Sequence, residues 1–189
     1  KDKYVYMELV KNFSQSKLIK SLFIIFIGSI LLAISAKIKI PFYPVPMTMQ
    51  TFVVLFIGIA FGWKLGVATI ALYLTEGIIG LPVFSGTPEK GIGLTYFFGP
   101  TFGYLVGFLV TVFLAGKFNY SSNLLKNFIK LVFATSFIYF LGILWLGGLI
   151  GWDKPIFKLG VQPFLLAELF KILLATFAIN YIKKIRKIF

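Results

Sequence analysis

The sequence contains neither cysteine nor histidine, and it carries little charge. Only 13% of its 189 residues are charged, and six of them are acidic. Without cysteine the chain has no disulfide, no thiol nucleophile and no thiolate metal site. Without histidine it lacks the commonest general base and the commonest metal ligand. These absences argue against a metalloenzyme or a Ser-His-Asp hydrolase, and we expect no catalytic residues, no metal site and no cofactor.

What the chain has in abundance is apolar side chains. They make up 59% of the sequence, and aromatic residues alone account for 19%. Soluble domains average about 45–50% apolar and about 25% charged residues. This chain has too few polar groups to cover a water-exposed surface. The composition therefore indicates a membrane protein that has the lipid bilayer as a partner.

The apolar residues gather in runs that are long enough to span a membrane. A helix needs about 20 residues to cross roughly 30 Å of hydrocarbon. We therefore predict an all-α protein with one domain over residues 1–189 and six transmembrane helices, at about 18–37, 48–62, 65–81, 97–116, 129–150 and 161–182.

The first of these runs follows a basic stretch, which is also the outline of a secretory signal. No small-residue cleavage site follows Leu22–Ala36, and further spans come after it, so we interpret it as the first transmembrane helix. The sequence begins at Lys1 rather than methionine, which leaves room for a few preceding residues.

The net charge of +13 comes from basic clusters between the apolar runs. Nucleic-acid binding would favour a continuous basic stripe, so we expect no nucleic-acid partner. With a cytoplasmic N-terminus, thirteen basic residues lie inside and five outside. The positive-inside rule then predicts that both termini are cytoplasmic. We expect a multi-pass protein of a bacterial plasma or inner membrane.

The prolines are distributed asymmetrically in this topology. Proline fixes φ and lacks an N–H donor, so it marks stiff, non-helical backbone, which membranes tolerate only inside protein or beside a wet cavity. The outer half is therefore where we expect a site, beneath a proline-rich loop between the first two helices. All eight prolines fall on that side: Pro41, Pro44, Pro46, Pro82, Pro88, Pro100, Pro155 and Pro163.

Three ionisable residues lie well inside predicted spans, namely Glu76, Glu168 and Lys171. Such residues are costly in hydrocarbon and are functional candidates by default. Glu168 and Lys171 are spaced i, i+3, so they share a helix face, roughly 10 and 15 Å from the outer end of that helix. They form either a structural ion pair or a polar clamp for a ligand that has both donors and acceptors.

Other candidates have two interpretations each. Glu76, a candidate for the substrate site, either reaches the interface or a residue that supports the site, or is structural. Gln50 either faces a cavity or caps its helix. Tyr43, Tyr96 and Tyr104 suit an amphipathic pocket wall, but tyrosine also populates the membrane interface.

Small residues recur at four-residue spacing, which lets helices approach closely. We expect plain helix packing from two sets of glycines, Gly58, Gly62 and Gly66, and Gly99, Gly103 and Gly107. Ser29 and Ala33 have the same spacing on the first helix, where they pack either within the chain or against a partner subunit.

Four ordered motifs resemble those of the BioY family, the biotin-binding membrane subunits of energy-coupling-factor (ECF) transporters. The first is the run IPFYPVPMTMQTF at residues 40–52. The others are YLTEG with GLPVF at 73–77 and 80–84, GPTFGYL at 99–105, and GVQPF at 160–164 followed by Glu168 and Lys171. The resemblance covers residues 40–171.

The resemblance implies a six-helix substrate-binding subunit that holds biotin in an outward-facing pocket under the first loop. It assigns ligand binding to Glu168 and Lys171, with Glu where the family more usually has Asp. Lys90, in the second outer loop, is the candidate for a basic residue that the family supplies there. Phe102 stands where the family usually has glycine.

The resemblance also implies partners. Ser29 and Ala33 approximate the family's small-xxx-small contact motif. The sequence has no Gly-x-x-x-x-Gly-Lys-Ser/Thr loop, so ATP hydrolysis requires a separate ATPase and a coupling membrane subunit. Some members of the family are found without dedicated partners.

Two other functions are compatible with parts of the sequence. One is a related subunit for another vitamin, such as thiamine or riboflavin. The other is an intramembrane enzyme that uses Glu76 and Glu168 as an acid–base pair. Against the enzyme, the sequence has no recognisable nucleophile motif, and Lys171 beside Glu168 favours an ionised carboxylate.

Overall fold

The computed structural model describes residues 2–40 and 43–186 as a mostly helical chain. Lys1, Pro41 and Lys187, which the sequence analysis assigned to sides of the membrane, lie outside the described residues. The elements are α1 (Asp2–Lys37), β1 (Lys39–Ile40), β2 (Met47–Thr48), α2 (Gln50–Ile78), α3 (Leu94–Phe97), α4 (Phe102–Lys117), α5 (Leu124–Ile150), α6 (Ile156–Gly160), the 3₁₀ helix η1 (Gln162–Phe164) and α7 (Leu165–Arg186).

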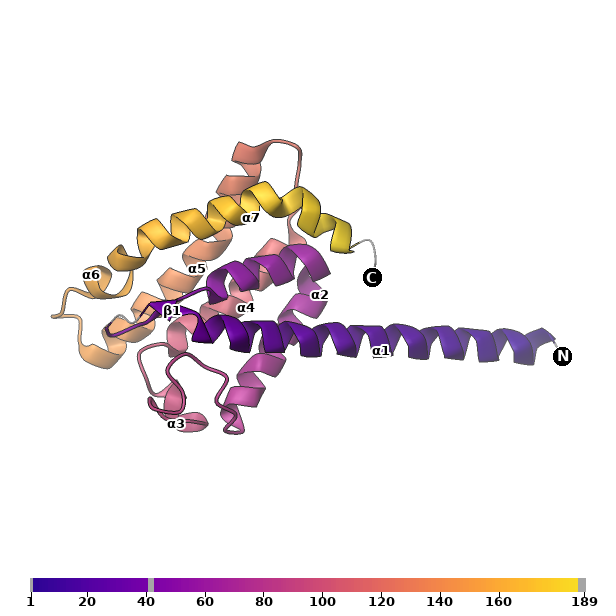
Figure 1. Cartoon of the computed structure of the whole chain (residues 1–189), viewed down its shortest axis with the longest axis horizontal. Coiled ribbons are helices and arrows are strands. Elements are labelled where there is room, and N and C mark those ends of the chain that lie inside the picture. Colours follow the sequence, from indigo (N-terminus) through magenta and orange to yellow (C-terminus); the bar gives the residue numbers. More distant parts are fainter. Residues whose placement is uncertain (1, 41–42, 187–189) are drawn as a thin grey trace.

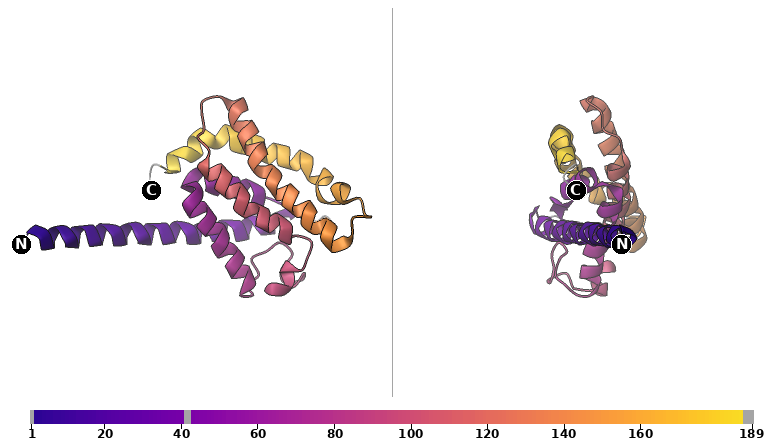
Figure 2. Two further views of the ribbon diagram at one scale, coloured as in Figure 1. Left: turned by 180° about the vertical axis from the view of Figure 1, so that it is seen from behind. Right: turned by 90° about the vertical axis from the view of Figure 1, so that its right-hand side faces the viewer.

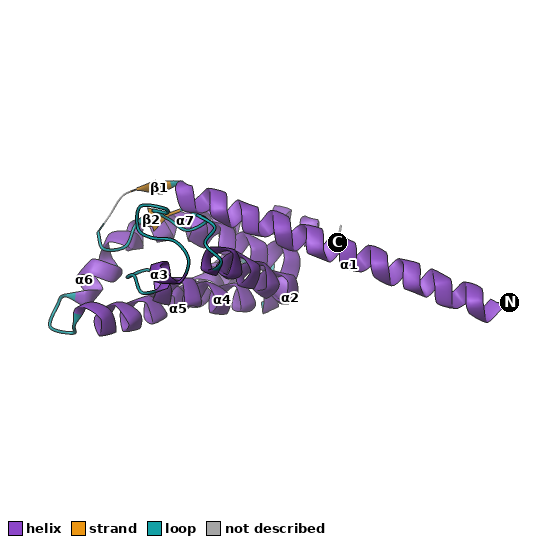
Figure 3. Ribbon diagram, turned by 90° about the horizontal axis from the view of Figure 1, so that it is seen from below, coloured by secondary structure: helices purple, strands orange, loops and turns teal. Residues whose placement is uncertain are grey.

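The helices form a bundle, and the N-terminal part of α1 extends well beyond it (Figures 1 and 2). The short elements β1, β2, α3 and α6 lie at one end, together with the longer connections, as Figure 3 shows in teal. We call this the loop end; it comprises residues 38–40, 43–49, 79–101 and 151–164. The C-terminal part of α7 lies at the opposite end.

A bend at Gly62 divides α2 into two helical arms. Gly62 has φ 77° and ψ 173°, a conformation that glycine adopts without a Cβ clash. Figure 1 shows that the chain changes direction sharply there. The sequence predicted two helices, 48–62 and 65–81, joined at this position. They correspond to the two arms of α2, the second of which ends at Ile78 rather than at residue 81.

Four helical segments of the described chain are long and apolar enough to cross a membrane: Lys17–Lys37, Gln50–Ile78, Leu124–Ile150 and Ile156–Arg186. The helix Phe102–Lys117 is apolar but shorter. The chain is thus a predominantly helical membrane protein, with one two-stranded antiparallel pairing, β1 with β2, in addition. The count of six spans stays a prediction.

Several helix ends differ from the predicted ones, each for a local reason. The fourth helix begins at Phe102 rather than at residue 97, because Pro100 interrupts the preceding turns. α5 begins at Leu124 rather than at 129, because the Asn123 side chain caps it by accepting the N–H of Lys126 at 3.0 Å. The last predicted helix, from residue 161, is broken near Pro163, and α7 begins at Leu165.

Four of the six recurrent glycines, Gly58, Gly66, Gly103 and Gly107, pack helices together, as the sequence predicted. For the other two the prediction was wrong, because Gly62 forms the bend of α2 and Gly99 lies before the start of α4. A Cβ placed on Gly107 of α4 would lie 2.5 Å from the Cα of Ile138 in α5. One placed on Gly58 of α2 would lie 2.9 Å from the Cβ of Ala115 in α4. Larger residues at these positions would force the helices apart. Phe102, at the family's usual glycine position, packs edge-on against Phe97 and Trp145.

Candidate binding site

A cavity at the loop end is enclosed by β2, α2, the 79–101 segment, α4, α5, η1 and α7. Its wall is mixed, with aromatic and aliphatic side chains beside a few polar groups, as in most small-molecule sites. It is lined by Val45, Pro46, Met47, Thr48, Gln50, Thr51, Ser85, Tyr96, Thr101, Tyr104, Leu105, Phe108, Ile138, Tyr139, Phe164 and Lys171.

Among the described residues of this wall, Lys171 of α7 alone is charged, and it is only 8% exposed. Its Nζ lies 3.0 Å from Glu168 Oε2, so the two residues predicted to share a helix face do form an ion pair. Nζ also donates to Thr51 Oγ1 at 2.7 Å and to the Thr48 carbonyl at 3.0 Å. An ammonium has three protons, so all of its donor capacity is used within the chain.

Glu168 is held as closely as its partner, with 4% of the residue exposed. Its Oε2 accepts from Lys171, from the Thr51 hydroxyl at 3.0 Å and from the Tyr139 hydroxyl at 2.7 Å. Its other oxygen, Oε1, is buried and has no hydrogen-bond partner among the described residues. Buried carboxylate oxygens are rarely left unpaired. Glu168 itself is not among the residues that line the cavity; it lies behind Lys171, which does.

A second unpaired polar group lies in the cavity wall itself. The Ser85 hydroxyl is buried and finds no partner in the described part of the chain. Its residue belongs to the 79–101 segment, which lies on the other side of the molecule from α7 (Figure 1). The cavity region therefore offers unused hydrogen-bonding capacity from two separate elements.

Three of the predicted uncharged candidates line the cavity. The Gln50 side chain donates to the Tyr73 hydroxyl at 2.8 Å and accepts from Thr48 Oγ1 at 3.2 Å, so it faces inward at the start of α2. The Tyr96 hydroxyl donates to the Ser85 carbonyl at 2.8 Å, and burial raises the pKa of Tyr96, which keeps it a neutral donor. The Tyr104 hydroxyl donates to the Gly160 carbonyl at 2.8 Å.

Three other candidates lie away from the cavity lining. Tyr43 is 84% exposed. Lys90 is exposed, and its aliphatic carbons lie over Gly86. Glu76 accepts a hydrogen bond from Ser29 Oγ at 2.9 Å, between α1 and α2. The structure thus brings none of the three side chains into the cavity wall, because each is directed elsewhere by its own segment.

The Ser29 contact also decides how one face of α1 packs. Ser29 is fully buried, and Ala33 is partly buried against the main hydrophobic core. Of the two alternatives given by the sequence, packing within the chain is the one that this conformation shows.

Sequence reasoning missed Thr51, Ser85, Thr101 and Tyr139, which line the cavity. Thr51 was part of the 40–52 motif but carries no charge to single it out. Tyr139 gave one usable signal: a phenol in the middle of a predicted span needs a hydrogen-bond partner there. Among the described residues, no cluster of three or more His, Cys, Asp or Glu could hold a metal ion.

The comparison with known proteins identifies the family. A model of the BioY family matches residues 7–188. The chain belongs to the BioY family. The sequences of several relatives align with this chain over most of their length. A probable biotin transporter BioY of Pyrococcus horikoshii is 34% identical over 145 residues, which are 75% of this chain and 82% of the relative. The biotin transporter BioY2 of Lactococcus lactis is 32% identical over 86% of this chain and 89% of its own.

The fold is also similar to that of a known crystal structure. A crystal structure of the S-component for biotin from an ECF-type ABC transporter superimposes with a TM-score of 0.74 and 26% identity. The match covers 89% of this BioY-family chain and 93% of the other. These relatives are named as transporters rather than as enzymes.

Proposed function

We propose that this chain is the substrate-specific subunit for biotin of an ECF-type transporter. The observation that carries the proposal is the buried Glu168–Lys171 pair, of which Lys171 lines the cavity and Glu168 keeps one oxygen, Oε1, without a partner among the described residues. The names of the relatives and of the similar structure support it. An intramembrane enzyme is disfavoured, because Glu76 is not in the cavity wall and bonds to Ser29 instead.

The chemistry of biotin suits this pair. Its ureido ring carries two N–H donors beside a carbonyl acceptor, so Glu168 Oε1 accepts from an N–H and Lys171 donates to the carbonyl. Because all three Lys171 protons are engaged in the chain, the ammonium has to exchange one internal bond for the ligand. The Thr48 carbonyl is the group to be released, since the other two contacts keep the ion pair intact.

The valerate tail of biotin ends in a carboxylate, which is costly to remove from water. It is expected to point toward the open side of the loop end. There the candidates are the unpaired Ser85 hydroxyl and, more remotely, Lys90, whose segment covers the cavity. Gln50, Tyr96 and Tyr104 form the walls between these two polar regions.

We further propose six spans with both termini cytoplasmic in a bacterial plasma membrane. The two arms of α2 count as two spans, and α1, α4, α5 and the α6–α7 segment supply the others. Thirteen inner against five outer basic residues favour this orientation, which places the loop end outside. Accumulation of biotin then needs a coupling membrane subunit and ATPase subunits, since the chain has no P-loop.

Equilibrium binding of radiolabelled biotin to the purified protein tests the function. Saturable binding that unlabelled biotin displaces, and that thiamine and riboflavin do not, is expected. Displacement by another vitamin instead would assign the chain to that vitamin. The proposal would be overturned if the protein bound none of the three vitamins saturably although its thermal unfolding transition showed that it was folded.

A further inference from the structure

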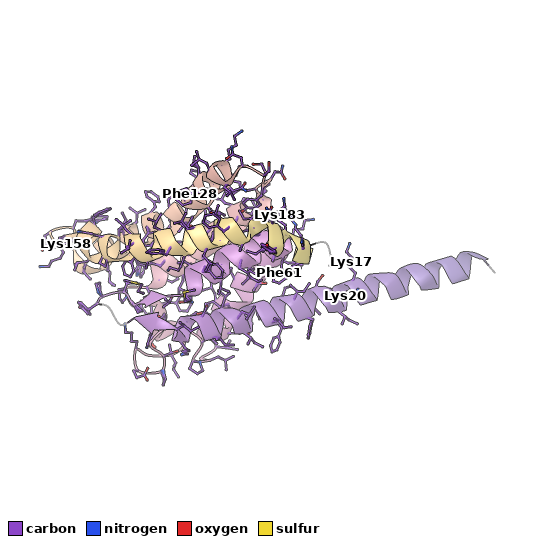
Figure 4. All side chains as sticks on the ribbon, turned by 45° about the horizontal axis from the view of Figure 1, so that its top comes forward. Lys17, Lys20, Phe61, Phe128, Lys158 and Lys183 are labelled. Carbon is purple, nitrogen blue, oxygen red and sulfur yellow. The ribbon has the colours of Figure 1, made fainter. Side chains whose placement is uncertain are left out.

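A second hollow lies at the end of the molecule opposite the loop end. It is bounded by α1, the Gly62 bend of α2 and the end of α7, and we call it the basic groove. Its cationic lining residues are Lys17, Lys20, Lys64 and Arg186, and its apolar lining includes Ile24 and Leu65. Figure 4 shows Lys17 and Lys20 on α1 beside Phe61 and the C-terminal part of α7.

The charge of the groove is of one sign. None of its lining residues is acidic, and within the described part of the chain none of its four basic side chains forms an ion pair. Four cations around one hollow repel one another unless an anion lies between them. The groove is thus electrostatically complementary to a bound anion, which its own chain does not supply among the described residues.

The geometry of Arg186 suits an oxyanion such as phosphate. Its guanidinium lies over Gly62, where an added Cβ would come within 2.7 Å of Nη2. The bare backbone at the bend therefore lets the guanidinium settle into the groove. A planar guanidinium offers paired N–H donors that match phosphate oxygens, while the lysines add positive charge around it.

The surroundings favour a lipid over a soluble phosphate compound. Beside Lys17 and Lys20, the same turns of α1 carry Leu18, Ile19, Leu22 and Phe23, whose exposed fractions are 60%, 66%, 57% and 62%. A ligand held at the groove by its phosphate therefore has an uncovered apolar helix face next to it. Only a molecule with both a phosphate and long apolar chains uses both surfaces.

We propose that the basic groove binds the headgroup of an anionic phospholipid, whose acyl chains lie along the exposed face of α1. The site is separate from the ligand cavity, because Arg186 and Lys171 are 15 residues apart on α7, which is roughly 22 Å along the helix. The inference does not depend on the vitamin that the cavity takes.

Native mass spectrometry of the detergent-purified protein tests this, with phosphatidylglycerol and phosphatidylcholine added separately. The wild type is expected to retain phosphatidylglycerol and to lose phosphatidylcholine. The double variant Lys64→Gln/Arg186→Gln is expected to retain at least tenfold less phosphatidylglycerol. The matched control Lys154→Gln/Lys158→Gln removes the same charge at the loop end and is expected to behave as the wild type.

The thermal unfolding midpoint of each variant shows that it is folded before lipid retention is compared. Equal retention of the two lipids by the wild type, or unchanged retention by the groove variant, would overturn the proposal. Stabilisation of delipidated protein by inorganic phosphate to the same extent as by phosphatidylglycerol would replace the lipid with a soluble phosphate compound. Loss of a co-purifying membrane protein, with lipid retention unchanged, would instead assign the groove to an acidic partner segment.

Discussion

At the scale of single residues, the decisive feature is an ion pair buried at the wall of a cavity. Glu168 and Lys171 are nearly inaccessible to solvent, yet each has bonds to other elements, so they also tie α7 to α2 and α5. The structural and the ligand-binding interpretations therefore coexist. What favours a ligand is Oε1 of Glu168, an acceptor that the described chain leaves unused.

Removing one member of the pair leaves the other charge buried and unpaired, which typically costs about 3–5 kcal/mol. We expect Lys171→Ala and Glu168→Ala each to weaken biotin binding several hundred-fold or more, because about 1.4 kcal/mol corresponds to tenfold in affinity. Lys90→Ala, whose side chain does not line the cavity, should cost tenfold or less. Isothermal titration calorimetry with biotin measures the affinity of all three variants.

Folded protein must be compared, so Lys171→Met, which keeps most of the aliphatic stem, and Glu168→Gln, which keeps the side-chain shape, accompany the alanine variants in thermal unfolding. If folded Lys171→Ala binds biotin as the wild type does, the ligand does not lie where the pair predicts.

Tyr139 supports the pair without carrying charge. Its hydroxyl donates to Glu168 Oε2 at 2.7 Å, and hydrogen bonds to charged groups contribute about 1.5–3 kcal/mol. Tyr139→Phe removes this donor alone and should weaken biotin binding by about tenfold or more in equilibrium titration. Tyr181→Phe, at a residue 73% exposed, is the matched control and should change nothing. Equal affinities for the two variants would show that Tyr139 does not hold the carboxylate in place.

At the scale of elements, the cavity depends on how the 79–101 segment is held. Lys37, the last residue of α1, donates from Nζ to the Phe84 carbonyl at 3.0 Å, the Thr87 carbonyl at 3.1 Å and Thr87 Oγ1 at 3.0 Å. Ser85, between these acceptors, lines the cavity. A single side chain from α1 thus positions part of the cavity wall.

Lys37→Met keeps the aliphatic stem and removes all three donors. We expect biotin to dissociate several-fold faster, with an affinity loss of about tenfold or less, since the lysine is partly solvated. Hydrogen exchange at the amides of Thr87 and Lys90, which bond within this segment, should accelerate in the same variant. Lys158→Met serves as control. Unchanged exchange and dissociation would mean that the segment is held by its apolar contacts alone, such as those of Phe84.

The Gly62 bend is the second feature of this scale. It lets α2 act as two arms that point in different directions, and the same bare backbone accommodates Arg186. One glycine therefore determines both the path of α2 and the shape of the basic groove at the opposite end from the cavity.

At the scale of the whole molecule, the proposed orientation in the membrane rests on the distribution of the basic residues. Because the sequence has no cysteine, a single introduced cysteine reports its own side of the membrane. Glu89→Cys, at the loop end, is expected to react with a membrane-impermeant thiol reagent in intact cells. Ser122→Cys, in the exposed connection between α4 and α5, is expected to react only after permeabilisation. The opposite labelling pattern would reverse the topology.

The sequence by itself determined that the protein lies in a membrane and that Glu168 and Lys171 are in contact. Apolar residues at 59% of the chain leave too few polar groups to cover a water-facing surface, so the membrane class follows from composition. The Glu168–Lys171 contact was predictable because residues three apart on one helix are neighbours whatever the rest of the chain does. The helix-packing role of Gly107 is local in the same sense, since its spacing places it on one face.

The tertiary structure alone decided the surroundings of that pair. Thr51 reaches Glu168 across 117 positions of sequence and Tyr139 across 29, and no spacing rule connects them. The exposed position of Tyr43 and the bond between Glu76 and Ser29 depend likewise on contacts between distant segments. A helix face is fixed by local geometry, whereas the side chains that meet it are fixed by the packing of whole elements, which no single stretch of sequence encodes.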